Sequence, residues 1–338
     1  MSININSKDL PDALIKILKA EKVPMIKASP GVGKSQIVKQ VADKYKLKLI
    51  DMRLSQYDPT DMNGFPTIEN SRSGYRPPET IPIEGDELPE GYVGWLLFLD
   101  EINSAPLAVQ AAGYKLILDR MIGQYNLHEA VVMVAAGNLD TDKAITNRMG
   151  TAMQSRMVHL NMGVSHKSWL NWAYGSGIDH RVTSFIEFRP ELLHRFDPKH
   201  SDDTFPCPRT WAFLSDIIKD VDEFTELDVA IAAGTVGEGA ALEFNGFVSI
   251  YDKLPKIQEI LKDPKNVPLS HDLSVRYAIS GLVAHEVDES NINKLAAFVE
   301  RLPPEFQLLT WRTAIKVNPA LMATPYIKEW IKVNAKEL

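Results

Sequence analysis

The sequence predicts a two-domain protein in which a parallel β-sheet flanked by helices is followed by an all-helical domain. Three observations predict this class. In the first half, short apolar runs alternate with helical patterns, as in βαβ units. The run at residues 95–99, Trp-Leu-Leu-Phe-Leu, is typical of a strand buried on both faces. Beyond about residue 164 the strand signal fades, so we expect an α/β domain over residues 1–163 and a helical lid domain over 164–338.

The apolar patterns place the expected elements in chain order. A helix is expected after Ser7, a candidate N-cap, because apolar residues from Leu10 to Leu18 recur on one helical face. The other expected elements of the first domain are strands at 23–26, 47–52, 95–99, 130–136 and 157–160 and helices at 34–46 and 106–120. The expected helices of the second domain are 167–174, 211–221, 226–233, 275–284 and 291–301.

Residues 64–94 differ in composition from the segments on either side. They contain five prolines and six acidic but only two basic residues. Proline disrupts regular ladders, so we expect a long loop here. Phe65 and Tyr75 lie within it, and exposed aromatic residues in loops usually pack locally.

Charge and cysteine content exclude several classes of protein. The 37 basic and 44 acidic residues give a net charge of −7, which disfavours a dedicated nucleic-acid binder. The single cysteine, Cys207, cannot form a disulfide within the chain, so we expect a reducing, cytoplasmic setting. We expect no secretory signal, because the N-terminus has no basic stretch followed by an apolar run. We expect no membrane span, because no apolar stretch approaches the roughly 18 residues that a span requires.

Residues 28–35, Ala-Ser-Pro-Gly-Val-Gly-Lys-Ser, have the pattern of a phosphate-binding loop, with Ala28 in place of the usual first glycine. Gly31 and Gly33 let backbone N–H groups curl around phosphate oxygens, Lys34 can reach the β- and γ-phosphates, and the Ser35 hydroxyl can bind Mg²⁺. An ordinary glycine turn before a helix is the alternative. The expected ATP-binding residues are Pro30, Gly31, Val32, Gly33, Lys34, Ser35 and Gln36.

Polar residues end two of the buried strands. Asp100 and Glu101 follow the run at 95–99, at the edge of the sheet where ligands of open α/β folds bind. We expect Asp100 to hold Mg²⁺ with Ser35, and Glu101 to polarise the attacking water. Asn138 follows the strand at 130–136 and could orient that water or contact the γ-phosphate. The alternatives are a solvated strand end for the acids and a turn cap for Asn138.

Together these motifs resemble the AAA+ ATPases, and more narrowly the MoxR-type group of bacteria and phages. The resemblance spans residues 25–215 and thins out towards the C-terminus. Besides the phosphate loop, the segments that carry it are Leu54–Pro66, Phe98–Asn103, Ala135–Asn138 and Pro206–Trp211.

The resemblance implies roles for residues outside these strand ends. It makes Asn138 the sensor 1 residue and Arg209 the sensor 2 residue of the lid. It also makes Arg156 an arginine finger that acts across a subunit boundary, with Arg148 as the alternative finger. Met157 stands where such families usually have phenylalanine after the finger. An ordinary surface ion pair is the alternative for both Arg156 and Arg209.

The resemblance also implies an activity and partners. It implies a ring, a hexamer in this family, in which Mg²⁺-dependent ATP turnover remodels a protein client, with a von Willebrand factor A domain protein as partner. Two alternatives stay open: a DNA-directed motor such as a helicase or loader, and a nucleotide-gated scaffold without turnover. The acidic segment at 64–94 offers no support for the DNA motor.

Overall fold

The computed structural model describes residues 3–69, 72–139, 147, 149–197, 202–221, 223–251 and 253–334, with the side chains of Glu69 and Arg72 excepted. The chain forms two compact units, Met1–Ser165 and His166–Leu338. The predicted fold class is confirmed: a parallel sheet flanked by helices forms the first unit, and the second is helical. No helix in the described part of the chain is both long and apolar enough to cross a bilayer.

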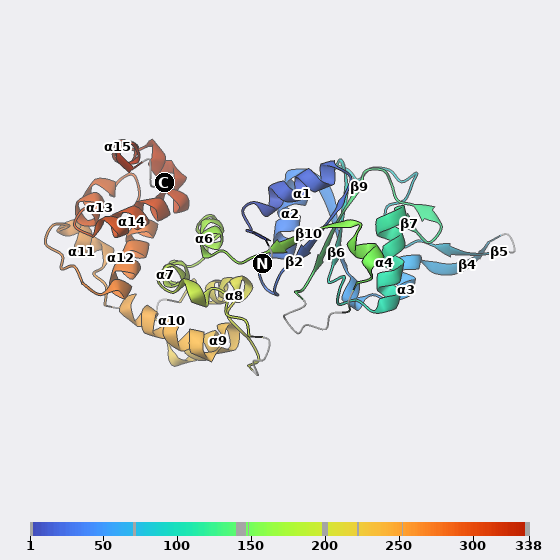
Figure 1. Cartoon of the computed structure of the whole chain (residues 1–338). Helices are drawn as coiled ribbons and strands as arrows, with labels where there is room; N and C mark the ends of the chain where they lie inside the picture. The colour runs from blue at the N-terminus through green and yellow to red at the C-terminus, as the bar shows by residue number, and fades with distance from the viewer. Residues whose placement is uncertain are drawn as a thin grey trace. The chain divides into compact units, whose positions relative to one another are not determined.

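All six strands of the main sheet run parallel, in the spatial order β1-β10-β2-β9-β6-β3 (Figure 1). Their bounds are β1 Asn4–Ile5, β2 Val23–Lys27, β3 Leu47–Arg53, β6 Gly94–Asp100, β9 Val131–Gly137 and β10 Met157–Met162. Because β9 lies between β2 and β6, the ends of these three strands are neighbours at one edge of the sheet. This order brings together the three motifs that the sequence singles out.

Helices cover the sheet on both faces, as the apolar strands require. Leu10 and Val38 of α1 and α2 pack on one face, against alternating strand residues such as Phe98. Val109 of α4 packs on the other face, against residues of opposite orientation such as Leu97. The helices of this unit are α1 Leu10–Lys19, α2 Lys34–Lys44, α3 Pro59–Asn63, α4 Leu107–Asp119 and α5 Thr151–Gln154.

The start of α1 differs from the expectation that Ser7 caps it. The helix begins at Leu10, and the preceding Asp9 makes no capping hydrogen bond through its side chain. Instead the Asn6 side chain accepts a hydrogen bond from the Asp9 N–H at 2.9 Å. Several polar residues near a helix start can supply this acceptor, so sequence alone does not decide among them.

The prediction of a long loop at residues 64–94 is wrong in its first part. Strands β4 (Phe65–Glu69) and β5 (Arg72–Arg76) form an antiparallel hairpin there. Gly64, with φ +88°, enters it so close to the Arg76 carbonyl that a Cβ would lie 2.2 Å from that oxygen. The side chains of Phe65, Ile68 and Tyr75 on the hairpin are 61, 82 and 49% exposed. A second hairpin pairs β7 (Met121–Ile122) with β8 (Tyr125–Asn126).

The second unit contains all five helices predicted for it and several that the sequence patterns did not reveal. Its helices are α6 His166–Gly175, α7 His180–Phe188, α8 Pro208–Ile218, α9 Glu226–Val236, α10 Glu238–Tyr251, α11 Ile257–Lys262, α12 Leu273–Glu286, α13 Ile292–Val299, α14 Pro304–Val317 and α15 Pro325–Asn334. Their core is rich in aromatic side chains, with Phe185 in ring contact with Trp211, Phe244 and Phe247.

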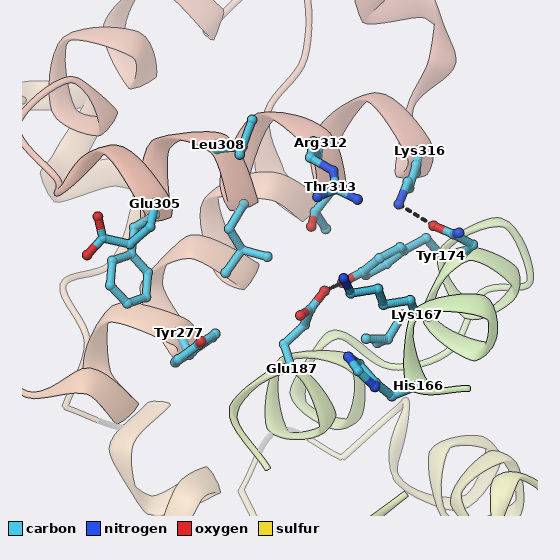
Figure 2. Close-up of a pocket in the computed structure, with 14 residues that line it drawn as sticks. His166, Lys167, Tyr174, Glu187, Tyr277, Glu305, Leu308, Arg312, Thr313 and Lys316 are labelled. Carbon is cyan, nitrogen blue, oxygen red and sulfur yellow. Dashed lines mark hydrogen bonds between the residues drawn. The ribbon is translucent and has the colours of Figure 1, made fainter. Parts of the chain in front are cut away.

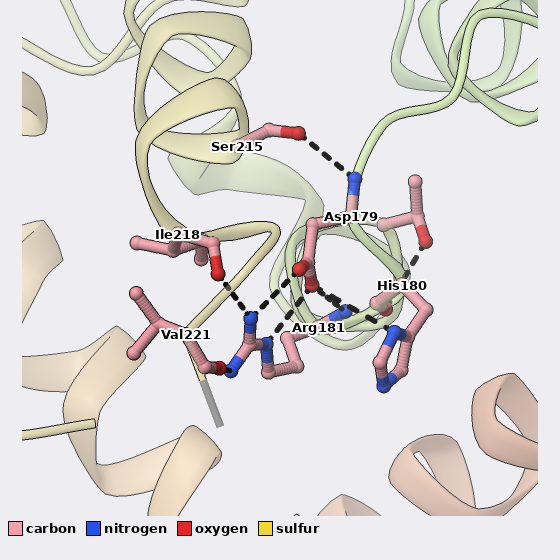
Figure 3. Close-up of polar contacts among 7 residues, drawn as sticks. Asp179, His180, Arg181, Ser215, Ile218 and Val221 are labelled. Atoms are coloured by element: carbon pink, nitrogen blue, oxygen red, sulfur yellow. Dashed lines mark hydrogen bonds and ion pairs between the residues drawn. The ribbon is translucent and has the colours of Figure 1, made fainter. Parts of the chain in front are cut away.

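A buried ion pair joins α7 to the end of α8 within this core (Figure 3). The Arg181 guanidinium donates to the Asp179 carboxylate and to the backbone carbonyls of Ile218 and Val221, at 2.6–3.0 Å. Burial opposes ionisation of Asp179, but the hydrogen bonds from Arg181 and the charges of His180 and Arg181 together keep the pKa of this carboxyl below its usual value. Arg181 therefore satisfies the last carbonyl of α8 and that of Val221 in the turn that follows.

Candidate functional site at the strand ends

The phosphate-loop motif forms the connection between β2 and α2. Gly31 and Gly33 have φ of +75° and +92°, in the left-handed region where a side chain is strained. Gly33 is also the residue that precedes the first turn of α2, so the N–H groups of the helix start point into the loop. Ala28, in the position usually held by glycine, lies fully buried in the core and has no positive φ. The position therefore accepts a methyl group.

The Lys34 ammonium lies at the centre of this loop. It donates hydrogen bonds to the carbonyl oxygens of Ala28 and Ser29 at 2.8 and 3.2 Å. It also donates to Asn138 Oδ1 at 3.3 Å, across 104 residues of chain. The structure thus brings together the predicted lysine and the predicted polar residue at the end of β9. Pro30, Val32 and Gln36 flank this centre, and Gln36 is exposed.

Ser35 and Asp100 are also brought together, as the sequence predicts for a metal site. The Ser35 hydroxyl donates to Asp100 Oδ2 at 3.2 Å, while Asp100 Oδ1 accepts from the Glu101 N–H at 2.9 Å. Neighbouring oxygen ligands of Mg²⁺, each 2.0–2.1 Å from the ion, lie about 3 Å apart. The two oxygens have the hard-donor chemistry and the separation that this ion requires.

Glu101 has an unusual backbone conformation: its φ is +55°, a value that residues other than glycine seldom adopt. The turn aims its carboxylate at η1, the short 3₁₀ helix Leu54–Gln56 after β3, where the Ser55 hydroxyl donates to Glu101 Oε2. Asp51 lies near both acids of the strand end. Partial burial, and then the charge of Asp100, raise the pKa of Asp51, while Arg53 opposes the shift. This edge of the sheet therefore carries concentrated negative charge, which favours a bound cation.

Asn103 is a residue of this site whose function the sequence does not reveal. It is buried, 2% exposed, and its side-chain amide makes two hydrogen bonds with the backbone of Asn138. Asn103 Nδ2 donates to the Asn138 carbonyl at 2.8 Å, and Asn103 Oδ1 accepts from the Asn138 N–H at 3.1 Å. A Cβ on Gly137 would lie 2.2 Å from Asn103 Oδ1, so the contact requires glycine at that position. The amide thus fixes the end of β9 to the acidic turn.

The arginines that the resemblance singles out belong to segments of the sequence outside the phosphate loop and the strand-end motifs. Arg156 is exposed between α5 and β10, and its guanidinium donates to the Ala152 carbonyl at 3.1 Å. Arg209 is exposed in the first turn of α8, in the second unit. Arg148 lies outside the described residues.

Comparison with known proteins gives weak likenesses. No protein-family profile matches the chain, and no curated protein is similar to it in sequence. Among solved structures, a mutant form of RuvB from Thermotoga maritima aligns over 78% of each chain, with 18% identity and a TM-score of 0.40. A candidate ATPase from Cytophaga hutchinsonii aligns over 98% of this chain and 89% of its own, with 14% identity and a TM-score of 0.35. At these scores neither likeness carries an inference about activity.

Proposed function

We propose that this protein binds ATP with Mg²⁺ in the loop between β2 and α2 and hydrolyses the γ-phosphate. The observation that carries the proposal is the meeting of three motifs, far apart in sequence, at one sheet edge. Lys34 contacts Asn138, and Ser35 contacts Asp100, in hydrogen bonds of 3.3 and 3.2 Å. A site for a triphosphate uses an ammonium group, backbone N–H groups exposed by glycines, and oxygen ligands for a metal ion. All three are present at this edge of the sheet.

Each group has a distinct role in this proposal. Lys34 exchanges its present carbonyl partners for phosphate oxygens, which are stronger acceptors because they are charged. Ser35 and Asp100 would hold Mg²⁺, which would neutralise part of the phosphate charge. Glu101 takes a proton from the attacking water, and the Asn138 amide orients the water or the γ-phosphate. The two hydrogen bonds from the Asn103 amide hold the Asn138 backbone in place for that task.

We further propose that subunits assemble into a ring, a hexamer in the family that the sequence resembles. The exposed Arg156 would then reach the γ-phosphate of a neighbouring subunit and neutralise its charge. Arg209 would contact the nucleotide from the helical unit, so that turnover moves this unit relative to the α/β unit. Both arginines are exposed, as residues that act on another subunit or another unit must be before assembly.

The work driven by turnover is proposed to be remodelling of a protein client, in the manner of MoxR-type ATPases, with a von Willebrand factor A domain protein as partner. The exposed aromatic residues of the β4–β5 hairpin, Phe65 and Tyr75, are candidates for client contact. A DNA-directed motor is less favoured, since the chain carries a net charge of −7 and lacks the excess of Lys and Arg that phosphate contacts call for.

The proposed hydrolysis is tested with the isosteric change Glu101→Gln, measuring ATP binding and turnover separately. We expect the variant to bind ATP·Mg²⁺ like the wild type but to lose at least about 100-fold in kcat, the usual worth of a general base. Glu90→Gln removes an exposed carboxylate from a loop of the same unit and should leave both quantities unchanged. Normal turnover by Glu101→Gln would exclude Glu101 as the base.

The proposed ring is tested by mixing two inactive variants, Arg156→Ala and Glu101→Gln. In a mixed ring, some sites combine an intact Glu101 with an intact Arg156 from the next subunit, so part of the activity should return. Native mass spectrometry reports whether mixed rings form. No recovery in rings shown to be mixed would assign the finger role to another residue, with Arg148 the first to test.

A further inference from the structure

A cavity of about 220 Å³ lies within the helical unit, away from any role assigned above (Figure 2). Helices α6, α7, α12 and α14 form its walls, and all the residues that line it belong to this one unit. Its charged groups are not evenly distributed, and this asymmetry indicates what it could bind.

One end of the cavity is cationic. Lys167 of α6 and Arg312 and Lys316 of α14 gather there around Tyr174 (Figure 2). Glu187 is the carboxylate at this end, and it accepts a hydrogen bond from the Tyr174 hydroxyl at 3.0 Å. Three basic side chains against one acidic side chain leave an excess of two positive charges.

The Lys316 ammonium is half-buried and is held by neutral groups. It donates to Asn171 Oδ1 and lies 5.5 Å from the centre of the Tyr174 ring. Partial burial, and then the charge of Arg312, lower the pKa of Lys316, while Glu187 opposes the shift. Among the described residues, neither Arg312 nor Lys316 has a carboxylate oxygen within 4.0 Å. Glu187 offsets only part of the charge of these two neighbouring cations, so the local potential stays positive and favours an anion.

The other end of the cavity is lined by apolar and aromatic side chains and by one carboxylate, that of Glu305. Tyr277 and Leu309 line it, together with Phe306, which is 3% exposed. Glu305 lies at this end, two helical turns from Arg312 along α14, and Figure 2 shows it well separated from the cationic end. A ligand with a negative group at one end and an apolar group at the other would match both halves.

We propose that this cavity is a binding site for a carboxylate attached to an apolar group, with the carboxylate on Arg312 and Lys316. A guanidinium binds a carboxylate through two parallel hydrogen bonds. The carboxylate belongs either to an acidic side chain next to an aromatic residue in a peptide or to a free small acid. The proposal does not depend on ATP hydrolysis.

The test uses two matched pairs of probes with the full chain and ligand-observed NMR. The peptide pair is N-acetyl-Glu-Phe-amide and N-acetyl-Gln-Phe-amide, and the small-acid pair is 3-phenylpropionate and 3-phenylpropionamide. We expect at least one carboxylate to bind about tenfold more tightly than its neutral partner, the worth of one charge-assisted hydrogen bond. Preference for the peptide identifies a protein ligand, and preference for 3-phenylpropionate identifies a small acid.

Variants then locate the site. Arg312→Gln should weaken carboxylate binding about tenfold. Among the described residues the Arg312 side chain makes no hydrogen bond, so the change should leave the fold intact. Lys328→Gln removes an exposed positive charge from α15 and should leave binding unchanged. Binding of neither carboxylate, equal binding of charged and neutral probes, or full binding by Arg312→Gln would each overturn the proposal.

Discussion

The two hydrogen bonds between the Asn103 side chain and the Asn138 backbone allow a quantitative prediction. Asn103→Ala removes two hydrogen bonds, of 2.8 and 3.1 Å, and leaves a backbone N–H and a C=O without these partners at a partly buried position. Each such loss costs about 1–2 kcal/mol, so the free energy of unfolding should fall by about 2–4 kcal/mol. Asn138 should also lose its fixed position, and kcat for ATP should fall more than KM changes.

Gly137→Ala perturbs the same contact from the opposite side. Its new Cβ would lie 2.2 Å from Asn103 Oδ1 and 2.9 Å from the end of the Met25 side chain, so the amide must leave. We expect a loss of stability similar to that of Asn103→Ala. Once Asn103 is alanine, however, the added methyl group meets only the flexible end of Met25. The double variant should therefore be more stable than the sum of the single changes predicts, by at least about 1 kcal/mol.

The assay is urea unfolding of the two single variants and the double variant, with ATP turnover measured in parallel. Gly113→Ala is the matched control, because a Cβ at this position in α4 meets nothing within 4 Å, and alanine favours a helix. It should be neutral or stabilising by up to about 1 kcal/mol. Additive losses in the double variant, or an Asn103→Ala protein of wild-type stability and kcat, would refute this account of the contact.

Two further predictions concern Glu101 and the helical unit. Ser55→Ala frees the Glu101 carboxylate from its hydroxyl partner, so basal ATP turnover should rise about twofold to tenfold with binding unchanged, in a steady-state assay; unchanged or lower turnover would show that Ser55 does not restrain Glu101. Burial, and then the charge of His180, lower the pKa of His285 to about 4, so this histidine is neutral in the folded state. Its stabilising contribution is present above the unfolded pKa of about 6.5 and is lost as the pH falls towards 4, by about 1–3 kcal/mol. The urea midpoint of unfolding should be lower at pH 5 than at pH 7, and this difference should be smaller in His285→Gln. An equal difference in wild type and variant would contradict the prediction.

The sequence reveals the centre of the candidate site because physical constraints restrict its residues to a few types. Gly31 and Gly33 adopt positive φ, which favours glycine, and Asp100 ends a wholly apolar strand. Parallel strands place their carboxyl ends at one edge, so the meeting of Lys34 with Asn138 follows from the strand order. Which strands are neighbours comes from the structure.

Other parts of the site depend on contacts that no local pattern encodes. Asn103 and Ser55 are single polar residues in short turns, and their partners, Asn138 and Glu101, lie 35 and 46 residues away. The β4–β5 hairpin escapes prediction because Pro66, the four other prolines of residues 64–94 and the charged residues have the composition of a loop. The close approach of Gly64 to the Arg76 carbonyl, which goes with the pairing, is a contact that no local pattern shows. The cationic cavity of the helical unit combines residues of four helices.

The central claim is that backbone amides and Lys34 hold a triphosphate, with Mg²⁺ on Ser35 and Asp100. Titration calorimetry of folded protein with a non-hydrolysable ATP analogue, with and without Mg²⁺, tests it most directly. We predict Mg²⁺-dependent binding that Lys34→Ala weakens by about 100-fold and that Lys39→Ala, an exposed lysine of the same helix, leaves intact. Folded wild-type protein without affinity for the analogue, or equal binding by Lys34→Ala, would contradict the claim.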